Sequence, residues 1–311
     1  MTRFSQTPEV TVIVVSFNTR DLTCKALETL IEYGGDVSMQ VIVWDNASHD
    51  GSADAVEERF KQVEVIRSDE NLGFGRANNE AGKHALGEFV LLLNSDTETL
   101  PGAVEKLLDF AKAHPEAGIV GGRTLFADGS LNKTSVLNAL SPWSLICSAF
   151  SLTQIFPNSS LFNPELIGGW QRDDMREVDI VAGCWLMLTK ELWDRLEGFN
   201  QDFFMYGEDA DLCLRTKKMG YKLMMCPEAE IVHLGGASMV QREEKLVQLM
   251  RGRVRTVRSH WNKAMIPLGV GLIWLWIAVR YVSSWFKPAK ARSTSIWPSM
   301  WASRGDWLKG W

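Results

Sequence analysis

The chain has 311 residues, of which 46% are hydrophobic, and it carries a net charge of −5. This length allows one large domain, or a smaller domain with a further segment about half its size. The apolar content is sufficient for a packed core. A charge this close to neutral does not suggest a nucleic-acid partner. One block departs from the average, because seven basic residues lie between Gln241 and Met265 against two acids. Such a block is typical of a segment that contacts phosphates or an anionic membrane surface.

The cysteines are scattered and include no Cys-x-x-Cys pair. They lie at Cys24, Cys147, Cys184, Cys213 and Cys226, and several are inside apolar runs. Buried free thiols in a reducing compartment are the simplest interpretation. The polar segment Met1–Glu9 lacks the apolar stretch of a signal peptide. We therefore expect a cytoplasmic protein.

The first 125 residues alternate between strand and helix patterns. Runs of β-branched and other apolar residues predict buried strands at Val10–Ser16, Val41–Trp44, Val63–Ile66 and Phe89–Leu93. Apolar residues at helical spacing predict helices at Leu22–Ile31, Ala53–Phe60 and Ala103–Ala113. Ile119–Val120 is too short to assign. The alternation predicts an α/β fold in which helices cover both faces of a mostly parallel sheet.

The segment from residue 124 to 176 is irregular and aromatic, which is typical of a binding loop or a lid. Regular patterns return after it. They predict a strand at Ile180–Leu188, helices at Lys190–Arg195 and Asp209–Met219, and a short strand at Lys222–Met225.

The C-terminal region is apolar and rich in tryptophan. Ala264–Val279 is interrupted only by Pro267 and two glycines, and it is shorter than the roughly 20 residues that span a bilayer. Seven tryptophans lie in this run and in the tail after it, from Trp274 to Trp311, and tryptophan favours the membrane interface. We predict a helical, membrane-associated segment at the inner face of the cell membrane. A short span, and a buried helix or oligomer contact, are the alternatives.

Polar residues follow four of the predicted strands, where parallel sheets bind ligands. The turn after the first strand, Ser16–Arg20, contains no glycine, and the chain has no GxxxxGK[ST] loop. A divalent metal held by a carboxylate is then the obvious way to bind phosphate. Asp96, just after a buried strand, suits that role. The alternative is an aspartate that only stabilises a turn.

Two further features could carry chemistry. Glu208, Asp209 and Asp211 open a predicted helix directly after the aromatic stretch 203–206. Acids at this position stabilise a helix through its dipole, or one of them serves as a general base at the edge of an apolar pocket. His233 ends a short apolar run, where it is either a structural hydrogen-bonding residue or a ligand.

The order of these motifs resembles the family 2 glycosyltransferases, in particular the bacterial rhamnosyltransferase-like branch. The matching pieces cover roughly residues 10–240. They are Val12–Asn18, Asp45–Ser48, Asp50–Ser52, Asn71–Gly75, Asn94–Asp96, Gly183–Leu188, Gly198–Arg215, Pro227 and His233. Each piece is weak alone, and their order and spacing make the resemblance specific.

The resemblance implies a GT-A fold, a nucleotide-diphospho-sugar donor and inversion at the anomeric carbon. It implies that Asp45 contacts the nucleotide base. The other implied donor contacts are Ser16, Asn18, Arg76, Asn78, Asn94 and Ser95. Trp185 either walls the sugar pocket with the aromatic residues 203–206 or packs in the core.

The resemblance also implies a metal site and a base. Asn94-Ser95-Asp96 matches the Asp-x-Asp metal motif with asparagine in place of the first acid. Asp96 is therefore the implied ligand of Mg²⁺ or Mn²⁺, and His233 completes the site. Asp209 matches the catalytic base, with Glu208 beside it.

We therefore expect an inverting hexosyltransferase that works in cell-surface glycan synthesis. The expected domains are a GT-A domain at 1–240 and, at 241–311, a basic linker helix with the membrane-associated tail. The expected donor is dTDP-rhamnose, with UDP-galactofuranose, UDP-glucose and UDP-galactose as competitors, and the expected acceptor is lipid-linked or a polysaccharide. A homodimer is a further candidate assembly. The competing hypotheses are a sugar nucleotidyltransferase and a non-catalytic sugar-binding or scaffold protein.

Overall fold

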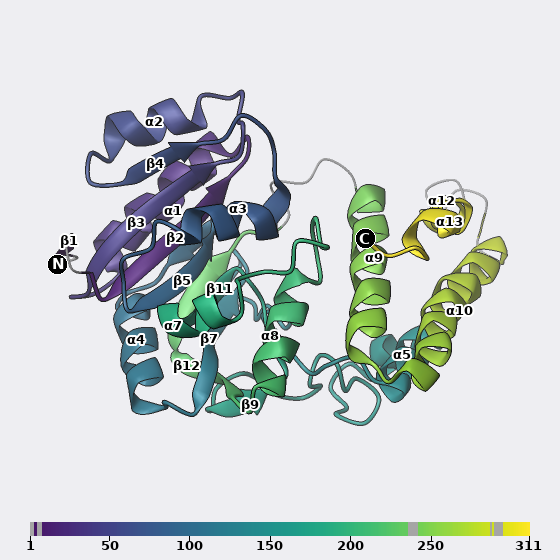
Figure 1. Ribbon diagram of the computed structural model, residues 1–311. Helices are drawn as coiled ribbons and strands as arrows, with labels where there is room; N and C mark the ends of the chain where they lie inside the picture. Colours follow the sequence, from purple (N-terminus) through teal and green to yellow (C-terminus); the bar gives the residue numbers. More distant parts are fainter. Residues whose placement is uncertain (1–2, 5–7, 236–241, 287, 289–294) are drawn as a thin grey trace. The chain divides into compact units, whose positions relative to one another are not determined.

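The computed structural model describes residues 3–4, 8–235, 242–286, 288 and 295–311 (Figure 1). The residue contacts divide the chain into two compact units. The first unit comprises Met1–Leu137, Gln171–Phe204 and Leu212–Ser238, and the second comprises Asn138–Trp170, Met205–Asp211 and Met239–Trp311. The predicted boundary between residues 240 and 241 lies outside the described residues. The second unit also contains two earlier segments that the sequence assigned to the first domain.

A mixed sheet forms the centre of the first unit. Its main path runs in the order β1-β3-β2-β5-β11-β7-β12-β6, with β4 beside β3 and β9 beside β12. The strands are β1 (Arg3–Phe4), β2 (Val10–Ser16), β3 (Ser38–Asp45), β4 (Glu64–Arg67), β5 (Phe89–Asn94), β6 (Thr97–Thr99), β7 (Ala117–Leu125), β9 (Arg176–Val178), β11 (Trp185–Thr189) and β12 (Lys222–His233). Two short strands, β8 (Val136–Leu137) and β10 (Ile180–Val181), pair separately.

The N-terminal part of this sheet is parallel, as the sequence predicts. Val12 of β2 pairs with Val41 of β3 on one side and with Leu91 of β5 on the other. These residues are fully buried, which explains why the strands are unbroken apolar runs. Strand β11 then runs antiparallel between β5 and β7. The sheet is therefore mixed, with its parallel strands concentrated at the N-terminal side.

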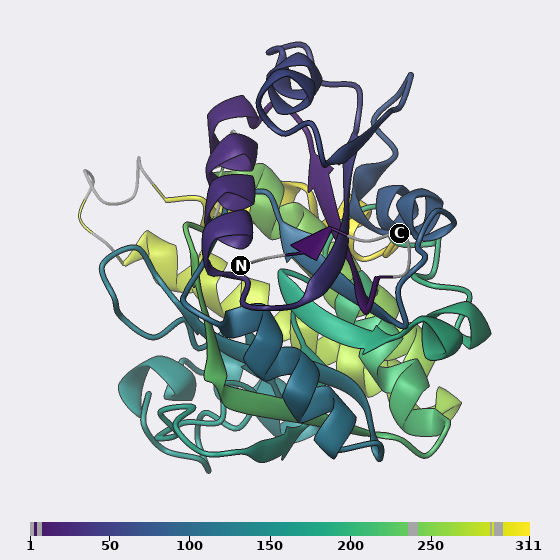
Figure 2. The same ribbon diagram turned by 90° about the vertical axis from the view of Figure 1, so that its left-hand side faces the viewer.

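Helices cover both faces of the sheet, as expected. The helices of the first unit are α1 (Arg20–Tyr33), α2 (Ser52–Arg59), α3 (Gly73–Gly82), α4 (Ala103–Ala113) and α7 (Lys190–Arg195), together with most of α8 (Glu208–Lys218). Val12 and Val14 pack in one apolar cluster with residues of α1, α2 and α4. Helix α3 contacts the same strands with residues that lie outside that cluster. Figure 2 shows α1, in purple, beside these strands.

Strand β7 is longer than the sequence indicated, because three glycines, Gly118, Gly121 and Gly122, interrupt its apolar pattern. A Cβ atom on Gly122 would lie 2.1 Å from the carbonyl oxygen of Ala229 and 2.3 Å from the indole nitrogen of Trp185. Only glycine fits between these groups. Gly122 thus makes the strand harder to predict from the sequence, although the packing of β7 requires a glycine there.

Two strand predictions were wrong in their extent. The predicted strand Ile180–Leu188 is two strands, because β10 leaves the main sheet to pair with β8. The predicted short strand before Pro227 continues to His233. The register of β12 against β7 shifts between Cys226 and Glu230, so the proline lies in an irregularity where no ladder hydrogen bond is required of it.

The second unit is helical. Its helices are α5 (Pro142–Ala149), α6 (Leu152–Ile155), α9 (Arg242–His260), a 3-10 turn at Lys263–Met265, α10 (Ile266–Trp285), α12 (Trp297–Ala302) and α13 (Arg304–Trp307). Buried apolar residues of α5, α9, α10, α12 and α13 form one core, which includes Val254, Ile273 and Trp307. The predicted long loop between residues 124 and 176 therefore contains two short helices, and α5 belongs to this core.

The arginines of the basic block are used inside the second unit. Arg253 forms a salt bridge with Glu165 and lies over the ring of Trp276. Arg258 donates to the carbonyl oxygens of Leu308 and Lys309. The expectation that this block contacts phosphates or lipids is thus not supported for these two side chains, because α9 uses them to hold other parts of its own unit.

Helix α10 is longer than its apolar run suggested. It continues to Trp285 because Arg280 turns inward, where its guanidinium donates to the carbonyl oxygens of Ser148 and Ala149 and lies over Trp276. In the described part of the chain, Lys263–Trp285 is the one helical segment long and apolar enough to cross a membrane, with a mean hydropathy of 1.7. Only 28% of the apolar 18-residue stretch within this segment is buried in the structure.

Replacing Gly122 with alanine should reduce the free energy of unfolding by about 1–3 kcal/mol, because the added methyl group overpacks a closed space. Urea denaturation of the two proteins measures the difference. Gly271→Ala in α10 is the control, since nothing lies within 4 Å of its Cβ position. We expect that change to be neutral or to stabilise by up to about 1 kcal/mol. Equal effects at the two positions would contradict the packing argument.

Candidate functional site

Asp96 and His233 lie together at one edge of the sheet, although 137 residues separate them. Strand β6 begins directly after Asp96 and pairs antiparallel with the end of β12, so that Thr97 lies opposite His233. Nε2 of His233 lies 3.0 Å from Oδ1 of Asp96 and 3.4 Å from Nδ2 of Asn94. The structure thus brings together the two side chains to which the resemblance assigned the metal, Asp96 and His233, and places Asn94, an implied donor contact, beside them.

The electrostatics of this pair favour a proton on the imidazole when no cation is bound. Burial lowers the pKa of His233, but Cys184 and Asp96 outweigh that effect by charge and hydrogen bonding and raise it to about 10. A cation that uses Nε2 as a ligand must compete with this proton. Cys184 is a neighbour of His233 that the sequence did not indicate.

The residues fit a cation that takes part of its coordination from a substrate. Oδ1 of Asn94 is buried and has no hydrogen-bond partner among the described residues. Within that part of the chain, no cluster of three or more His, Cys, Asp or Glu side chains could hold a metal alone. Mg²⁺ and similar ions often accept one or two protein ligands and fill the remaining positions with phosphate oxygens and water.

Asp45 and Asn18 meet at the neighbouring strand ends. Oδ2 of Asp45 accepts from the backbone N–H of Ser48 at 3.1 Å, while its Oδ1 is buried without a hydrogen-bond partner among the described residues. Asn18 has a left-handed φ of 52° and accepts from the backbone N–H of His49 at 2.8 Å. Oδ1 of Asp45 is thus a buried acceptor whose hydrogen bond the described residues do not supply.

Three predicted donor contacts are buried within the first unit. Ser16 is fully buried and its hydroxyl bonds to Thr23 at 2.9 Å. Asn78 is 1% exposed and its amide donates to the carbonyl oxygen of Phe74. Trp185 is 1% exposed and belongs to the main core cluster. Direct contact of Ser16, Asn78 and Trp185 with a donor stays a prediction, and the packing of Trp185 in the core cluster agrees with the alternative for that residue.

Two other predicted contacts have different surroundings. The hydroxyl of Ser95 accepts from Thr19 at 3.2 Å, inside the same buried network as Ser16. Arg76 is exposed and donates to the backbone carbonyl oxygen of Gln201 at 3.2 Å. Arg76 is therefore accessible to a ligand, whereas Ser95 helps to fix the turn before Asp96.

Two asparagines that the sequence left without a role hold the loops of this region. Nδ2 of Asn46 donates to Asn71 at 2.8 Å, and its Oδ1 accepts from the N–H of Leu72 at 2.9 Å. Asn79 bonds both the N–H and the carbonyl oxygen of Phe199 at 2.8 Å. In the sequence, the only sign of these roles is that Asn46 and Asn79 are polar and lie next to Asp45 and Asn78. That sign does not distinguish a residue that contacts a ligand from one that holds a loop.

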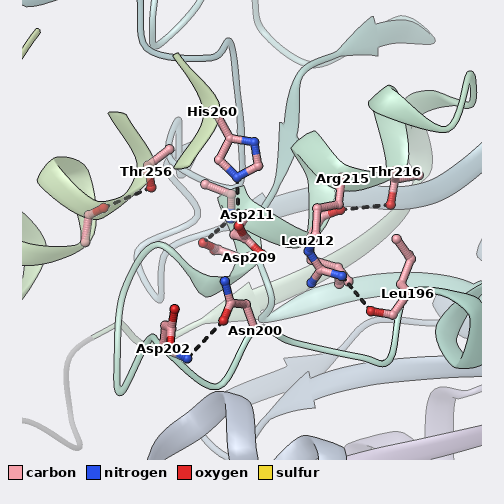
Figure 3. A network of polar contacts seen from close by, with 12 residues as sticks. Leu196, Asn200, Asp202, Asp209, Asp211, Leu212, Arg215, Thr216, Thr256 and His260 are labelled. Carbon is pink, nitrogen blue, oxygen red and sulfur yellow. Dashed lines mark hydrogen bonds and ion pairs between the residues drawn. The ribbon is translucent and has the colours of Figure 1, made fainter. Parts of the chain in front are cut away.

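The acidic turn, Glu208–Asp211 at the start of α8, belongs to the second unit. Figure 3 shows Asp209 and Asp211 of this turn. Glu208 is buried, and its Oε2 has no hydrogen-bond partner among the described residues. Burial, and then the charge of Asp209, raises the pKa of Glu208 to about 8. Oδ1 of Asp209 accepts from the N–H of Ala210 at 2.7 Å. The environment thus keeps Glu208 neutral near pH 7, next to a second acid.

Comparison with known proteins gives two family matches. A model described as "Glycosyl transferase family 2" matches residues 11–193, and one described as "N-terminal domain of galactosyltransferase" matches residues 175–243. The first match covers more than half of the chain.

Curated relatives are more distant. An N-acetylglucosaminyl-diphospho-decaprenol L-rhamnosyltransferase of Mycobacterium tuberculosis is 26% identical in an alignment 219 residues long, which covers 63% of this chain and 66% of that protein. An O-antigen biosynthesis protein of Myxococcus xanthus is 25% identical over 75% of this chain and 18% of its own length. The chain therefore spans slightly less than two thirds of the first relative and a small part of the second.

Solved structures share the fold. A mannosyltransferase of Pyrobaculum calidifontis, in complex with GDP-Man and Mn²⁺, has a TM-score of 0.56 at 18% identity and covers 98% of this chain and 86% of its own. TarS of S. aureus, residues 1–349 in complex with UDP, has a TM-score of 0.53 at 15% identity and covers 97% and 80%. At these identities the similarity establishes the α/β, GT-A-like fold.

Glu208→Gln should flatten the pH dependence of stability between about pH 4.5 and 8. In that range the unfolded carboxyl has lost its proton while the folded one keeps it, so the free energy of unfolding falls as pH rises. The slope is at most about 1.4 kcal/mol per pH unit. Urea denaturation at several pH values measures it, and Glu244→Gln, at an exposed acid of α9, is the matched control. An unchanged slope in the Glu208 variant would contradict the assignment.

Proposed function

The chain belongs to glycosyltransferase family 2, and we propose that it transfers a sugar from a nucleoside-diphosphate donor to an acceptor hydroxyl with inversion at the anomeric carbon. Family membership gives the class of reaction, a nucleotide-sugar transfer. It also favours this activity over the sugar nucleotidyltransferase that the sequence left open.

The observation that carries the donor assignment is the pairing of Asp96 with His233 beside Asn94. A divalent cation held there by Asp96 and His233 would neutralise negative charge on the diphosphate as it leaves. Oδ1 of Asp45, which has no hydrogen-bond partner in the described part of the chain, supports a contact with an N–H group of the nucleotide base. Mn²⁺ in the solved mannosyltransferase complex supports the choice of cation, and Mg²⁺ is the alternative.

The reaction needs one base, and we assign that role to Asp209. Its carboxylate accepts the proton of the acceptor hydroxyl while the acceptor oxygen forms its bond to the anomeric carbon. The bond from that carbon to the phosphate oxygen breaks, and the nucleoside diphosphate leaves with the bonding electron pair. Because Glu208 holds its own proton near pH 7, only one of the two neighbouring acids is charged before the reaction.

The proposed donor sugar is rhamnose, carried by dTDP. The mycobacterial relative is named as an L-rhamnosyltransferase that acts on a decaprenol-linked acceptor, which supports rhamnose and a lipid-linked acceptor here. A thermal-shift screen with Mn²⁺ or Mg²⁺ compares dTDP-rhamnose with UDP-galactofuranose, UDP-glucose and UDP-galactose. The true donor should raise the melting temperature most, because it binds the folded state. A larger shift with a UDP-sugar would overturn the choice of donor.

Asp96→Asn and Asp209→Asn should separate donor binding from transfer. The first should weaken Mn²⁺-dependent binding of the donor by about tenfold or more, since it removes a charged ligand. The second should leave donor affinity within about twofold and reduce kcat by at least about 10²-fold, since it removes the base. Calorimetry and a transfer assay measure the two effects.

The control for both variants is Asp109→Asn, at an exposed acid of α4, which should change neither quantity. Full turnover by the Asp209 variant would refute the base assignment. Metal-dependent binding that survives in the Asp96 variant would refute the metal site.

We also propose that α10 associates with the membrane through its exposed face. Leu268, Val282 and Phe286 are exposed at helical spacing, and Trp274 and Trp285 are exposed as well. Leu272, Ile273, Ile277 and Arg280 face the interior of the second unit. This supports a helix that lies on the membrane with one face, because spanning would expose the buried Arg280 or remove its partners.

Replacing Leu268, Val282 and Phe286 together with serine should reduce binding to lipid vesicles by about tenfold or more, because interfacial binding scales with buried apolar area. Co-sedimentation with vesicles that contain anionic lipid measures this. Leu86→Ser with Met219→Ser, at exposed apolar positions of the first unit, is the control. Unchanged binding would refute the proposal, and a changed oligomeric state instead would identify the face as a dimer contact. Deleting the tail is a poorer test, since α10 and α12 supply part of the core of the second unit.

A further inference from the structure

The acidic turn is joined to α9 by a buried hydrogen bond inside the second unit (Figure 3). Nε2 of His260 lies 2.7 Å from Oδ1 of Asp211, and the two side chains are 5% and 3% exposed. An ionised carboxylate only accepts hydrogen bonds, so the imidazole is the donor. Breaking such a bond leaves a buried polar group unsatisfied, which makes it a firm attachment.

A second contact joins the same helix to the residues just before the turn. A Cβ atom on Gly252 would lie 2.1 Å from the carbonyl oxygen of Tyr206, so the backbone of α9 lies directly against this residue. Tyr206 has a left-handed φ of 66°, which is unfavourable for a residue with a bulky side chain. The close fit at Gly252 holds this conformation in place.

The two contacts come from one side of α9. Gly252, Thr256 and His260 are spaced four residues apart, so they follow one another along the helix over about 12 Å. Thr256 is buried, and its hydroxyl donates to the carbonyl oxygen of Gly252 at 2.9 Å, as Figure 3 shows. Its polar group is therefore satisfied within the helix. This side of α9 is shaped to receive the segment Met205–Asp211.

Asp211 is in turn fixed to the beginning of α8. Its backbone N–H donates to the carbonyl oxygen of Gly207 at 2.9 Å, so that the first helical turn encloses Glu208 and Asp209. A displacement of Asp211 therefore moves the backbone that carries Asp209. Small errors in the placement of a base reduce the rate strongly, by up to about 10²-fold for 1 Å.

We propose that His260 is a positioning residue for the transfer reaction: through Asp211 it sets the place and direction of Asp209. The proposal rests on the proposed function of Asp209 as the base. It assigns a role in the reaction to α9, a helix that the sequence interpretation treated as a linker.

The test compares His260→Leu, which removes the donor at similar volume, with His260→Gln, which keeps an N–H group at the end of the side chain. The leucine variant should lose at least about tenfold in kcat, while the KM for the donor changes less than about twofold. The glutamine variant should recover kcat to within about threefold of the original protein. Rates are expressed per molecule that binds the donor, as counted by calorimetry, so that loss of folded protein does not imitate the effect.

His84→Leu, at an exposed histidine of the first unit, is the matched control and should leave both constants unchanged. If the leucine variant does not fold, His260→Asn replaces it, because its amide is too short to reach Asp211; a loss of kcat is expected there too. A normal kcat per donor-binding molecule in the leucine or asparagine variant would overturn the proposal. A glutamine variant whose kcat is as low as that of these variants would also overturn it.

The outcomes separate this inference from the function on which it depends. Absence of sugar transfer by the unchanged protein would count against the proposed function. Normal transfer by the unchanged protein and by the His260 variants alike would leave that function standing and refute the positioning role alone.

Discussion

The change of register in β12 is the constraint on which the first unit's site depends. Up to Cys226 the strand pairs with β7 as far as Gly122, and from Glu230 it resumes with Arg123. Three residues of β12, from 227 to 229, thus lie between two consecutive residues of β7 in the pairing. The inserted segment includes Pro227, which has no N–H to give to a ladder. Only after this shift does the strand reach β6 and bring His233 to Asp96.

The same region shows why some of the structure could be predicted from sequence and some could not. Val10–Ser16 is buried on both faces, so nearly all of its residues are apolar or small, and the bounds of the strand were predicted correctly. Gly122 and Pro227 are required by contacts with residues distant in the chain, and locally they look like strand breakers. The candidate site behaves likewise. A motif can place Asp96 and His233 at strand ends, but only the fold distinguishes Arg76, which is exposed, from Asn78, which is buried.

The structure leaves several buried polar atoms unsatisfied among its described residues, and the most informative ones lie at candidate functional positions. Oδ1 of Asp45 and Oδ1 of Asn94 in the first unit, and Oε2 of Glu208 in the second, have no hydrogen-bond partner there. Each such atom costs about 1–3 kcal/mol when no ligand or water satisfies it. A sequence optimised for stability alone would not retain them. A ligand or a water molecule that donates to Oδ1 of Asp45 or to Oδ1 of Asn94 would remove this cost.

Helix α9 connects the features of the second unit that seemed unrelated in the sequence. Arg253 and Arg258 hold Glu165 and the C-terminal residues, and Val254 and Val257 fill the core shared with α10. A further side of the helix, with Gly252 and His260, receives the acidic turn. A substitution that alters the packing of α10 or of the C-terminal tail therefore also affects α9, the helix that holds Asp211.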